Sequence, residues 1–319
     1  MINEVLKFIV SLVGLCYGAN LLVRGSGQIA RAAGVSGLVV GLTVVSLATS
    51  APELFISVIA ALNGNADLAI GNVVGSNIAN IGLVMALTAV VGRGLVFNKN
   101  VANRDCIVMV GATLLVFPLM WDLRLVRWEG GLLAILLFGY LLAVVRSANE
   151  DRRARNQPIP VPGKSTSTVA GKWWESLGIV VLGVLLLTGG SMLLRDSVSA
   201  IAIKLGVSEL IIALTMVSVG TSLPELATSI MAVLKKDKGL ALGNIVGSNI
   251  FNLTLVLGIT SIVAPISSIS SEVLYKQYPA MLAITLLLVV LSRRRSQIRL
   301  KDGYYLAAAY LGIMGWILF

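Results

Sequence analysis

Two glutamates stand in the middle of apolar stretches of this sequence. Glu53 and Glu225 lie 172 residues apart, and each directly follows a proline in a T-S-x-P-E motif. A carboxylate near the centre of a membrane costs at least about 2.5–3.5 kcal/mol, so it normally faces a polar cavity or a partner. The two acids predict a buried cation site. The alternative is a pair of protonated glutamates that only bond neighbouring helices.

Hydroxyl and amide side chains recur at helical spacing around each glutamate. Steps of three or four residues place them on one helix face. The first copy of this stripe is Ser46, Ser50, Glu53 and Ser57, and the second is Ser218, Ser222, Glu225 and Ser229. A further stripe follows each, made of Asn72, Ser76 and Asn80 and of Asn244, Ser248 and Asn252. Both stripes supply oxygen atoms.

The prolines add backbone oxygens to this set. Pro52 and Pro224 have no N–H, so the carbonyls four residues earlier lose their helical donors. Inside a membrane such carbonyls persist only where a cavity, an ion or a neighbour satisfies them. The carbonyls of the two loosened turns belong to Ala48, Thr49, Gly220 and Thr221. All-oxygen sites suit hard cations, and two carboxylates balance one Ca²⁺, which Na⁺ ions could replace.

The two glutamate regions are copies of one another. Residues 41–80 and 213–252 align with 22 identities in 40 positions, and the matches include Pro, Glu, Asn and Gly. Shared membrane composition would instead give scattered Leu and Val matches. If each half contributes five spans, an odd number, the second half enters the membrane from the opposite side. We therefore expect an inverted repeat with a site near the bilayer midplane, as in secondary transporters.

Composition predicts the elements that position these residues. Hydrophobic residues form 57% of the 319, charged residues 13%, and the mean hydropathy is +0.91. The expected fold is an all-α integral membrane protein of ten transmembrane helices in two inverted five-helix repeats. The expected spans are 5–23, 37–62, 68–91, 105–121, 129–145, 176–194, 209–234, 240–264, 278–292 and 303–319.

The distribution of basic residues predicts the orientation. With both termini outside, 19 of the 25 Lys and Arg residues fall on the inner side. A nucleic-acid-binding face would not sort its charge by alternate loops, so we expect no nucleic-acid partner. The predicted location is the plasma (inner) membrane, with a cytoplasmic loop at 146–175. The predicted units are 1–146, with repeat core 41–80, a flexible linker at 147–175, and 176–319, with repeat core 213–252.

Other chemistries have little support. The chain has no histidine, and Cys16 and Cys106 sit at unrelated positions, which indicates neither a disulfide framework nor a zinc site. We expect no enzyme activity, no cofactor and no obligate protein partner. The expected surroundings are the lipid bilayer. An intramembrane enzyme that uses the two carboxylates as acid and base, and a passive cation channel, are the alternatives from other classes.

The paired G-T-S-x-P-E and G-N-x-x-G-S-N segments resemble the two repeats of the sodium/calcium exchangers, within the cation/Ca²⁺ antiporter superfamily. The likeness is greatest to the prokaryotic ten-helix branch and covers nearly the whole chain. The resemblance implies exchange of Ca²⁺ for Na⁺ by alternating access, with the first and sixth helices sliding across the other eight. The first copy carries Ala48 where glycine is usual.

The resemblance also implies roles for individual residues. Glu53 and Glu225 would coordinate Ca²⁺, together with the backbone carbonyls of Thr49 and Thr221. The flanking Na⁺ sites would use Ser50, Ser76, Ser222 and Ser248, with the carbonyls of Ser46 and Ser218. The centre would be lined by Asn80 and Asn252.

Two comparisons within the superfamily bear on the coupling ion. Many relatives, including potassium-dependent ones, carry aspartate where this chain has Asn252, which argues against potassium dependence. The proton/calcium branch usually carries G-N-x-x-E motifs, often with a histidine, and this chain has neither. Sodium is therefore the expected coupling ion, and H⁺/Ca²⁺ antiport through the glutamates stays open as the alternative.

Overall fold

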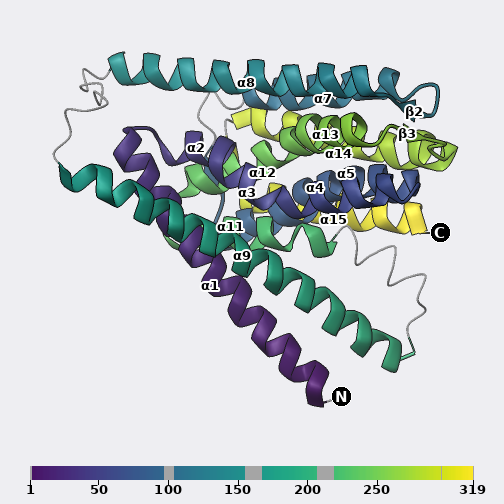
Figure 1. The fold of residues 1–319 in the computed structure, drawn as a ribbon, viewed down its shortest axis with the longest axis horizontal. Coiled ribbons are helices and arrows are strands. Elements are labelled where there is room, and N and C mark those ends of the chain that lie inside the picture. The colour runs from purple at the N-terminus through teal and green to yellow at the C-terminus, as the bar shows by residue number, and fades with distance from the viewer. Residues whose placement is uncertain (1, 97–103, 155–166, 207–218, 296, 319) are drawn as a thin grey trace.

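The computed structural model describes residues 2–96, 104–154, 167–206, 219–295 and 297–318, and nearly all of them are helical (Figure 1). The strands in this part of the chain are two residues long and form two small antiparallel pairs. β1 (Leu95–Val96) pairs with β4 (Gln297–Ile298), and β2 (Arg124–Leu125) pairs with β3 (Ile266–Ser267). Each pair joins two loops that lie far apart in the sequence.

Six helices of the described residues are long and apolar enough to cross a membrane, and a bent pair makes a seventh. The six are 3–33, 66–91, 127–150, 173–204, 238–263 and 273–293, and the bent pair is 37–49 with 51–62. Two shorter apolar helices, α7 (Cys106–Leu119) and α11 (Leu223–Leu234), accompany them. The expectation of a multi-pass helical membrane protein is confirmed.

Burial separates a central group of helices from an outer one. In the most apolar stretch of 66–91 and of 238–263, 78% and 83% of the residues are buried, against 22–33% for the spans 3–33, 127–150 and 173–204. The central spans are α5 (Ala66–Ala79), η2 (Asn80–Met85) and α6 (Ala86–Val91), and α12 (Lys238–Phe251), η4 (Asn252–Val256) and α13 (Leu257–Val263). The segments η2 and η4 are π-helical, as is η1 below.

The bent span packs directly on this centre. It consists of α2 (Gly37–Val40), η1 (Gly41–Val45), α3 (Ser46–Thr49) and α4 (Ala51–Leu62). A side chain on Gly243 of α12 would collide with the backbone of Leu42, because its Cβ would lie 2.8 Å from the Leu42 nitrogen. Glycine there lets the two helices approach closely, as small-xxx-small patterns do in membranes.

The helices that flank this centre are α7, α8 (Arg127–Ala154), η5 (Val273–Gln277) with α14 (Tyr278–Arg295), and α15 (Leu300–Leu318). The Tyr278 hydroxyl donates a 2.6 Å hydrogen bond to the Thr113 carbonyl, which ties α14 to α7. In Figure 1, α8 lies along one edge of the molecule.

Helices α1 (Ile2–Ala33) and α9 (Ser167–Lys204) run side by side, diagonally across the other helices (Figure 1). Both are longer than the spans expected from hydropathy, because their polar ends continue the helix past the apolar stretch. Likewise α8 reaches Ala154 and α9 begins at Ser167, so the ends of the expected linker are helical. Residues 155–166 lie outside the described part.

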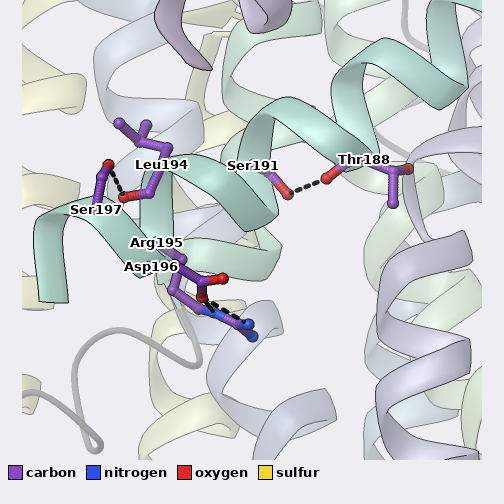
Figure 2. A network of polar contacts seen from close by, with 6 residues as sticks. All are labelled: Thr188, Ser191, Leu194, Arg195, Asp196 and Ser197. Atoms are coloured by element: carbon purple, nitrogen blue, oxygen red, sulfur yellow. Dashed lines mark hydrogen bonds and ion pairs between the residues drawn. The ribbon is translucent and has the colours of Figure 1, made fainter. Parts of the chain in front are cut away.

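Polar groups in the second half of α9 are paired locally (Figure 2). The Ser191 hydroxyl donates to the Thr188 carbonyl at 3.3 Å, and Ser197 donates to Leu194 at 2.9 Å. Arg195 and Asp196 form an ion pair at 3.0 Å. These hydroxyls bond within their own helix, so in this half of α9 the contacts with other helices come from its apolar and small residues.

Those small residues bring α1 and α9 into backbone contact. A Cβ on Gly183 would lie 2.7 Å from the Leu22 nitrogen, and one on Gly18 would lie 2.8 Å from the Leu187 nitrogen. Neither neighbour is a flexible side chain that could move aside. We infer that α1 and α9 form one closely packed helix pair.

Gly183→Ala is therefore expected to destabilise the protein by about 1–3 kcal/mol, the usual cost of overpacking. Gly189→Ala, on the same helix, is the matched control, because a Cβ there meets nothing within 4 Å. Thermal unfolding in detergent should show a lower midpoint for Gly183→Ala and an unchanged or higher one for Gly189→Ala. Equal midpoints would contradict close packing of the pair.

Candidate cation site

The two glutamates begin new helices at matching breaks in the chain. Ser50 precedes α4 and Ser222 precedes α11, and both have φ −81° and ψ 1°. Each proline lies in the first turn of its new helix, where its missing N–H costs nothing. The sequence predicted a loosened turn, and the structure has a break at the preceding serine, with a 40° bend in the first copy. The positive ends of α4 and α11 carry the acids, which favours their charged form.

Both carboxyl groups are completely buried. Glu53 and Glu225 have 0% exposed area, so neither faces lipid. Among the described residues, none of their four carboxyl oxygens has a hydrogen-bond partner. The two groups lie close enough to interact electrostatically. Buried acids that repel one another and lack donors require a cation or a proton as a partner.

Hydroxyls from both halves adjoin each carboxyl group without reaching hydrogen-bond geometry. Ser76 and Thr221 lie beside Glu53, while Thr49 and Ser248 lie beside Glu225. The hydroxyls of Ser76 and Thr221 are 2.9 Å apart, and those of Thr49 and Ser248 are 3.2 Å apart. The contacts are reciprocal: each threonine reaches the serine of the opposite half. The site is therefore shared between the two copies.

Two asparagines hold the glutamate backbones in place. The Asn72 amide donates to the Glu53 carbonyl at 3.1 Å and to the Ser57 hydroxyl at 2.9 Å. Asn244 repeats this arrangement, with 3.4 Å to the Glu225 carbonyl and 3.0 Å to the Ser229 hydroxyl. These side chains clamp α4 on α5 and α11 on α12, so Ser57 and Ser229 serve packing.

Further polar atoms near the break are buried and unpartnered within the described residues. They are the hydroxyls of Ser50 and Ser222, both amide atoms of Asn80, and the Oδ1 atoms of Asn72 and Asn252. Buried polar atoms are normally paired. Asn72 contacts the Glu53 backbone, and Ser50 and Ser222 directly precede the helices that carry the acids, so oxygen atoms of the kind that hard cations prefer lie close to both breaks.

Ser46, unlike Ser50, has a hydroxyl that is hydrogen-bonded to backbone carbonyls. Its hydroxyl donates to the Gly41 carbonyl at 2.7 Å and reaches the Asn244 carbonyl at 3.1 Å. Its own carbonyl accepts from the Ser50 nitrogen at 2.9 Å. The Ser46 side chain therefore packs α3 against α12. Ser218, its counterpart, lies outside the described residues.

Asn77 and Asn249, which were not among the predicted site residues, connect the two copies. The Asn77 amide donates to the Asn249 carbonyl at 3.3 Å, and the Asn252 amide donates to Asn77 Oδ1 at 3.1 Å. The available signal was their place in the repeated G-S-N-I segment. A second missed contact is the Arg195 stem, which passes 3.3 Å from the Cβ position of Gly220, next to Thr221.

The described residues contain no group of three or more His, Cys, Asp or Glu side chains placed to hold a metal. The acidic part of the site therefore consists of Glu53 and Glu225. With two carboxylates, hydroxyls and amide oxygens, the arrangement can bind a hard divalent cation, or monovalent cations in its place.

The fold and this site define a membrane transporter for cations. The family model described as sodium/calcium exchanger protein matches residues 4–146 and 175–319, and this chain belongs to that family. Membership of this family supports the conclusion that the protein is a cation/Ca²⁺ antiporter.

The chain is similar to known members over almost its whole length. It is 36% identical to the putative antiporter CaxA of Alkalimonas amylolytica over 98% of both chains. It is 28% identical to the sodium/calcium exchanger MaX1 of Methanosarcina acetivorans over 97% of both. A solved structure of the sodium-calcium exchanger NCX_Mj, soaked with 10 mM Na⁺ and zero Ca²⁺, matches with a TM-score of 0.84 at 29% identity over 98% of both chains.

Asn77→Ala should lower the free energy of unfolding by about 1–3 kcal/mol, because it leaves the buried Asn252 amide unpaired. The matched control is Asn249→Ala, whose amide donates only to Ile245 of its own helix at 2.7 Å. Thermal unfolding should show the larger loss for Asn77→Ala. An equal or smaller loss would mean that the bridge between copies contributes nothing.

Proposed function

We propose that this protein exchanges Ca²⁺ for Na⁺ across the plasma membrane by alternating access. The observation that carries the proposal is the pair of buried carboxyl groups of Glu53 and Glu225, contributed by matching halves, whose oxygens have no hydrogen-bond partner among the described residues. Two negative charges offset the charge of one Ca²⁺. The names of the relatives MaX1 and NCX_Mj, both sodium/calcium exchangers, support the same pair of ions.

The proposed Ca²⁺ ligands are the two carboxylates and the carbonyls of Thr49 and Thr221, at the ends of the broken turns. The hydroxyl positions suit smaller charges: Ser50, Ser76, Ser222 and Ser248 would hold Na⁺, with the carbonyls of Ser46 and Ser218. Asn80 and Asn252 would line the centre. Support comes from the unpartnered oxygens of Ser50, Ser222, Asn80 and Asn252.

Exchange follows from the cost of leaving the site empty. Two ionised, buried carboxylates repel one another and have lost their water, so an unloaded site is unfavourable. Ca²⁺ can leave at low cost only when other positive charges replace it, and in this proposal these are Na⁺ ions. Coupling between the two ions is therefore a property of the site itself.

We propose that the closely packed pair α1 and α9 moves across the remaining helices to open the site to either side. The pair shares backbone contacts at Gly18 and Gly183, so it would move as one body. Arg195 of α9 passes over Gly220, beside Thr221, and would carry that movement to the site.

The proposed topology is ten spans in two inverted halves, with both termini outside and the 146–175 loop in the cytoplasm. The reciprocal Thr–Ser contacts are consistent with two halves related by a two-fold axis. The unequal division of Lys and Arg residues between the two sides of the membrane supports this orientation of the chain. No cofactor or obligate protein partner is part of the proposal.

The test is ⁴⁵Ca²⁺ uptake into proteoliposomes loaded with Na⁺, with choline outside. Uptake should depend on the outward Na⁺ gradient and be unaffected by K⁺. Glu53→Gln and Glu225→Gln should each reduce it at least about 100-fold, because either substitution leaves one charge to bind Ca²⁺. Glu272→Gln is the matched control, because that side chain is 62% exposed and should not affect uptake.

Three other outcomes would overturn the proposal. Uptake that follows a pH gradient and ignores Na⁺ would assign H⁺/Ca²⁺ antiport. Single-channel currents would assign a passive pore. Full uptake by both glutamine variants would remove the glutamates from the site.

A further inference from the structure

One face of α1 carries a continuous series of residues that the cation site does not use. Tyr17, Asn20, Arg24, Gln28 and Arg31 follow one another at steps of three or four residues, so they share one side of the helix. Arg24 and Arg31 are exposed and form no ion pair with the described residues. Both guanidinium groups are therefore accessible to a ligand.

The arginine end of this face opens into a cavity between α1 and α9. The cavity has a volume of about 400 Å³ and is lined by Arg24, Gln28, Arg31, Ala32, Trp173, Glu175, Ser176 and Ile179. Its wall is fixed by the Ser176 hydroxyl, which donates to Gln28 Oε1 at 3.0 Å and is 5% exposed. The cavity thus combines fixed polar groups with two arginines.

The charge of this region is positive. Lys235, which directly follows α11, donates to the Asn20 carbonyl at 3.1 Å. Partial burial lowers the pKa of Lys235, and the neighbouring Arg24 charge lowers it further. Among the described residues that line the cavity, Glu175 is the one acid. Two arginines against one carboxylate, with a lysine nearby, favour an anion, and arginine forks match phosphate oxygens.

The other end of the same helix face is apolar. A shallow groove of about 410 Å³ is lined by Leu12, Val13, Cys16, Tyr17 and Asn20. From Leu12 to Arg24 the helix rises about 18 Å at 1.5 Å per residue. That length matches an extended acyl chain. The groove ends at Asn20, one helical turn before Arg24, and an apolar groove so close to a site for a phosphate fits a lipid better than a soluble anion.

Aromatic residues mark the membrane surface at the cavity. Trp173 lines it and contacts Trp174 edge to face, with ring centroids 5.9 Å apart. Tryptophan is enriched at the level of lipid headgroups. The arginines therefore sit at the depth where phosphates of one leaflet lie.

We propose that the α1–α9 cavity and groove form a binding site for one anionic phospholipid of the cytoplasmic leaflet. The headgroup phosphate contacts Arg24 and Arg31, and an acyl chain lies along Leu12, Val13 and Cys16. Basic pockets between membrane helices bind anionic headgroups in this way. The choice of leaflet, and any effect on the movement of α1 and α9, rest on the proposed function; the binding itself does not.

The test is native mass spectrometry of the full chain in detergent, titrated with phosphatidylglycerol, phosphatidylcholine or inorganic phosphate, without Ca²⁺. We expect wild-type protein to bind phosphatidylglycerol at least 10-fold more tightly than phosphatidylcholine. Arg24→Gln with Arg31→Gln should weaken phosphatidylglycerol binding at least 10-fold, while Arg24→Lys with Arg31→Lys should retain most of it. Arg146→Gln with Arg293→Gln is the matched control, since both side chains are exposed, and should change nothing.

A second variant separates a lipid from a free anion. Cys16→Trp fills the exposed apolar groove and should weaken the binding of phosphatidylglycerol while leaving both arginines in place. Equal affinity for both lipids, equal losses in the two glutamine pairs, or displacement of the lipid by millimolar phosphate would overturn the proposal. Because no ion transport is measured, these results are independent of the exchange assay.

Discussion

The central constraint on this structure is that two buried carboxyl groups lie close enough to repel one another when both are ionised. Glu53 and Glu225 have no exposed area, and their oxygens have no hydrogen-bond partner among the described residues. Ionised groups in such surroundings are stable only when a counter-charge lies between them. The surrounding contacts hold the acids near one another instead of relieving the repulsion: Asn72 and Asn244 fix the backbones, and the helix ends of α4 and α11 favour the charged form.

The internal repeat places the same structural parts on both sides of the site. One half provides an acid, a broken helix and an asparagine clamp, and its copy provides the same parts. The reciprocal contacts of Thr49 with Ser248 and of Ser76 with Thr221 join them. Outside the site, α1 and α9 pack through glycines on one another and stay at the edge of the helix bundle, an arrangement suited to a moving part.

Residue types and spacing were enough to predict the helical membrane fold and the approach of Glu53 and Glu225 to one another, with Ser76 and Ser248 beside them, because buried polar residues in apolar spans have few possible roles. The break at Ser50 was less accessible, since a proline four residues past a carbonyl predicts a kink but not which residue leaves the helix. The inward packing of Ser46 and the bridge at Asn77 depend on the approach of distant helices, which helical spacing does not contain. The lengths of α1, α8 and α9 exceeded the apolar stretches for a different reason, because charged residues can continue a helix into water.

The most direct measurement is an anomalous-scattering map from crystals of this protein grown in Ca²⁺ or Sr²⁺ without Na⁺. We expect one strong peak between the carboxyl groups of Glu53 and Glu225, within about 2.3–2.6 Å of their oxygens for Ca²⁺. The peak should vanish in crystals transferred to high Na⁺. A divalent ion bound elsewhere, or a peak that stays when both glutamates are replaced by glutamine, would contradict it.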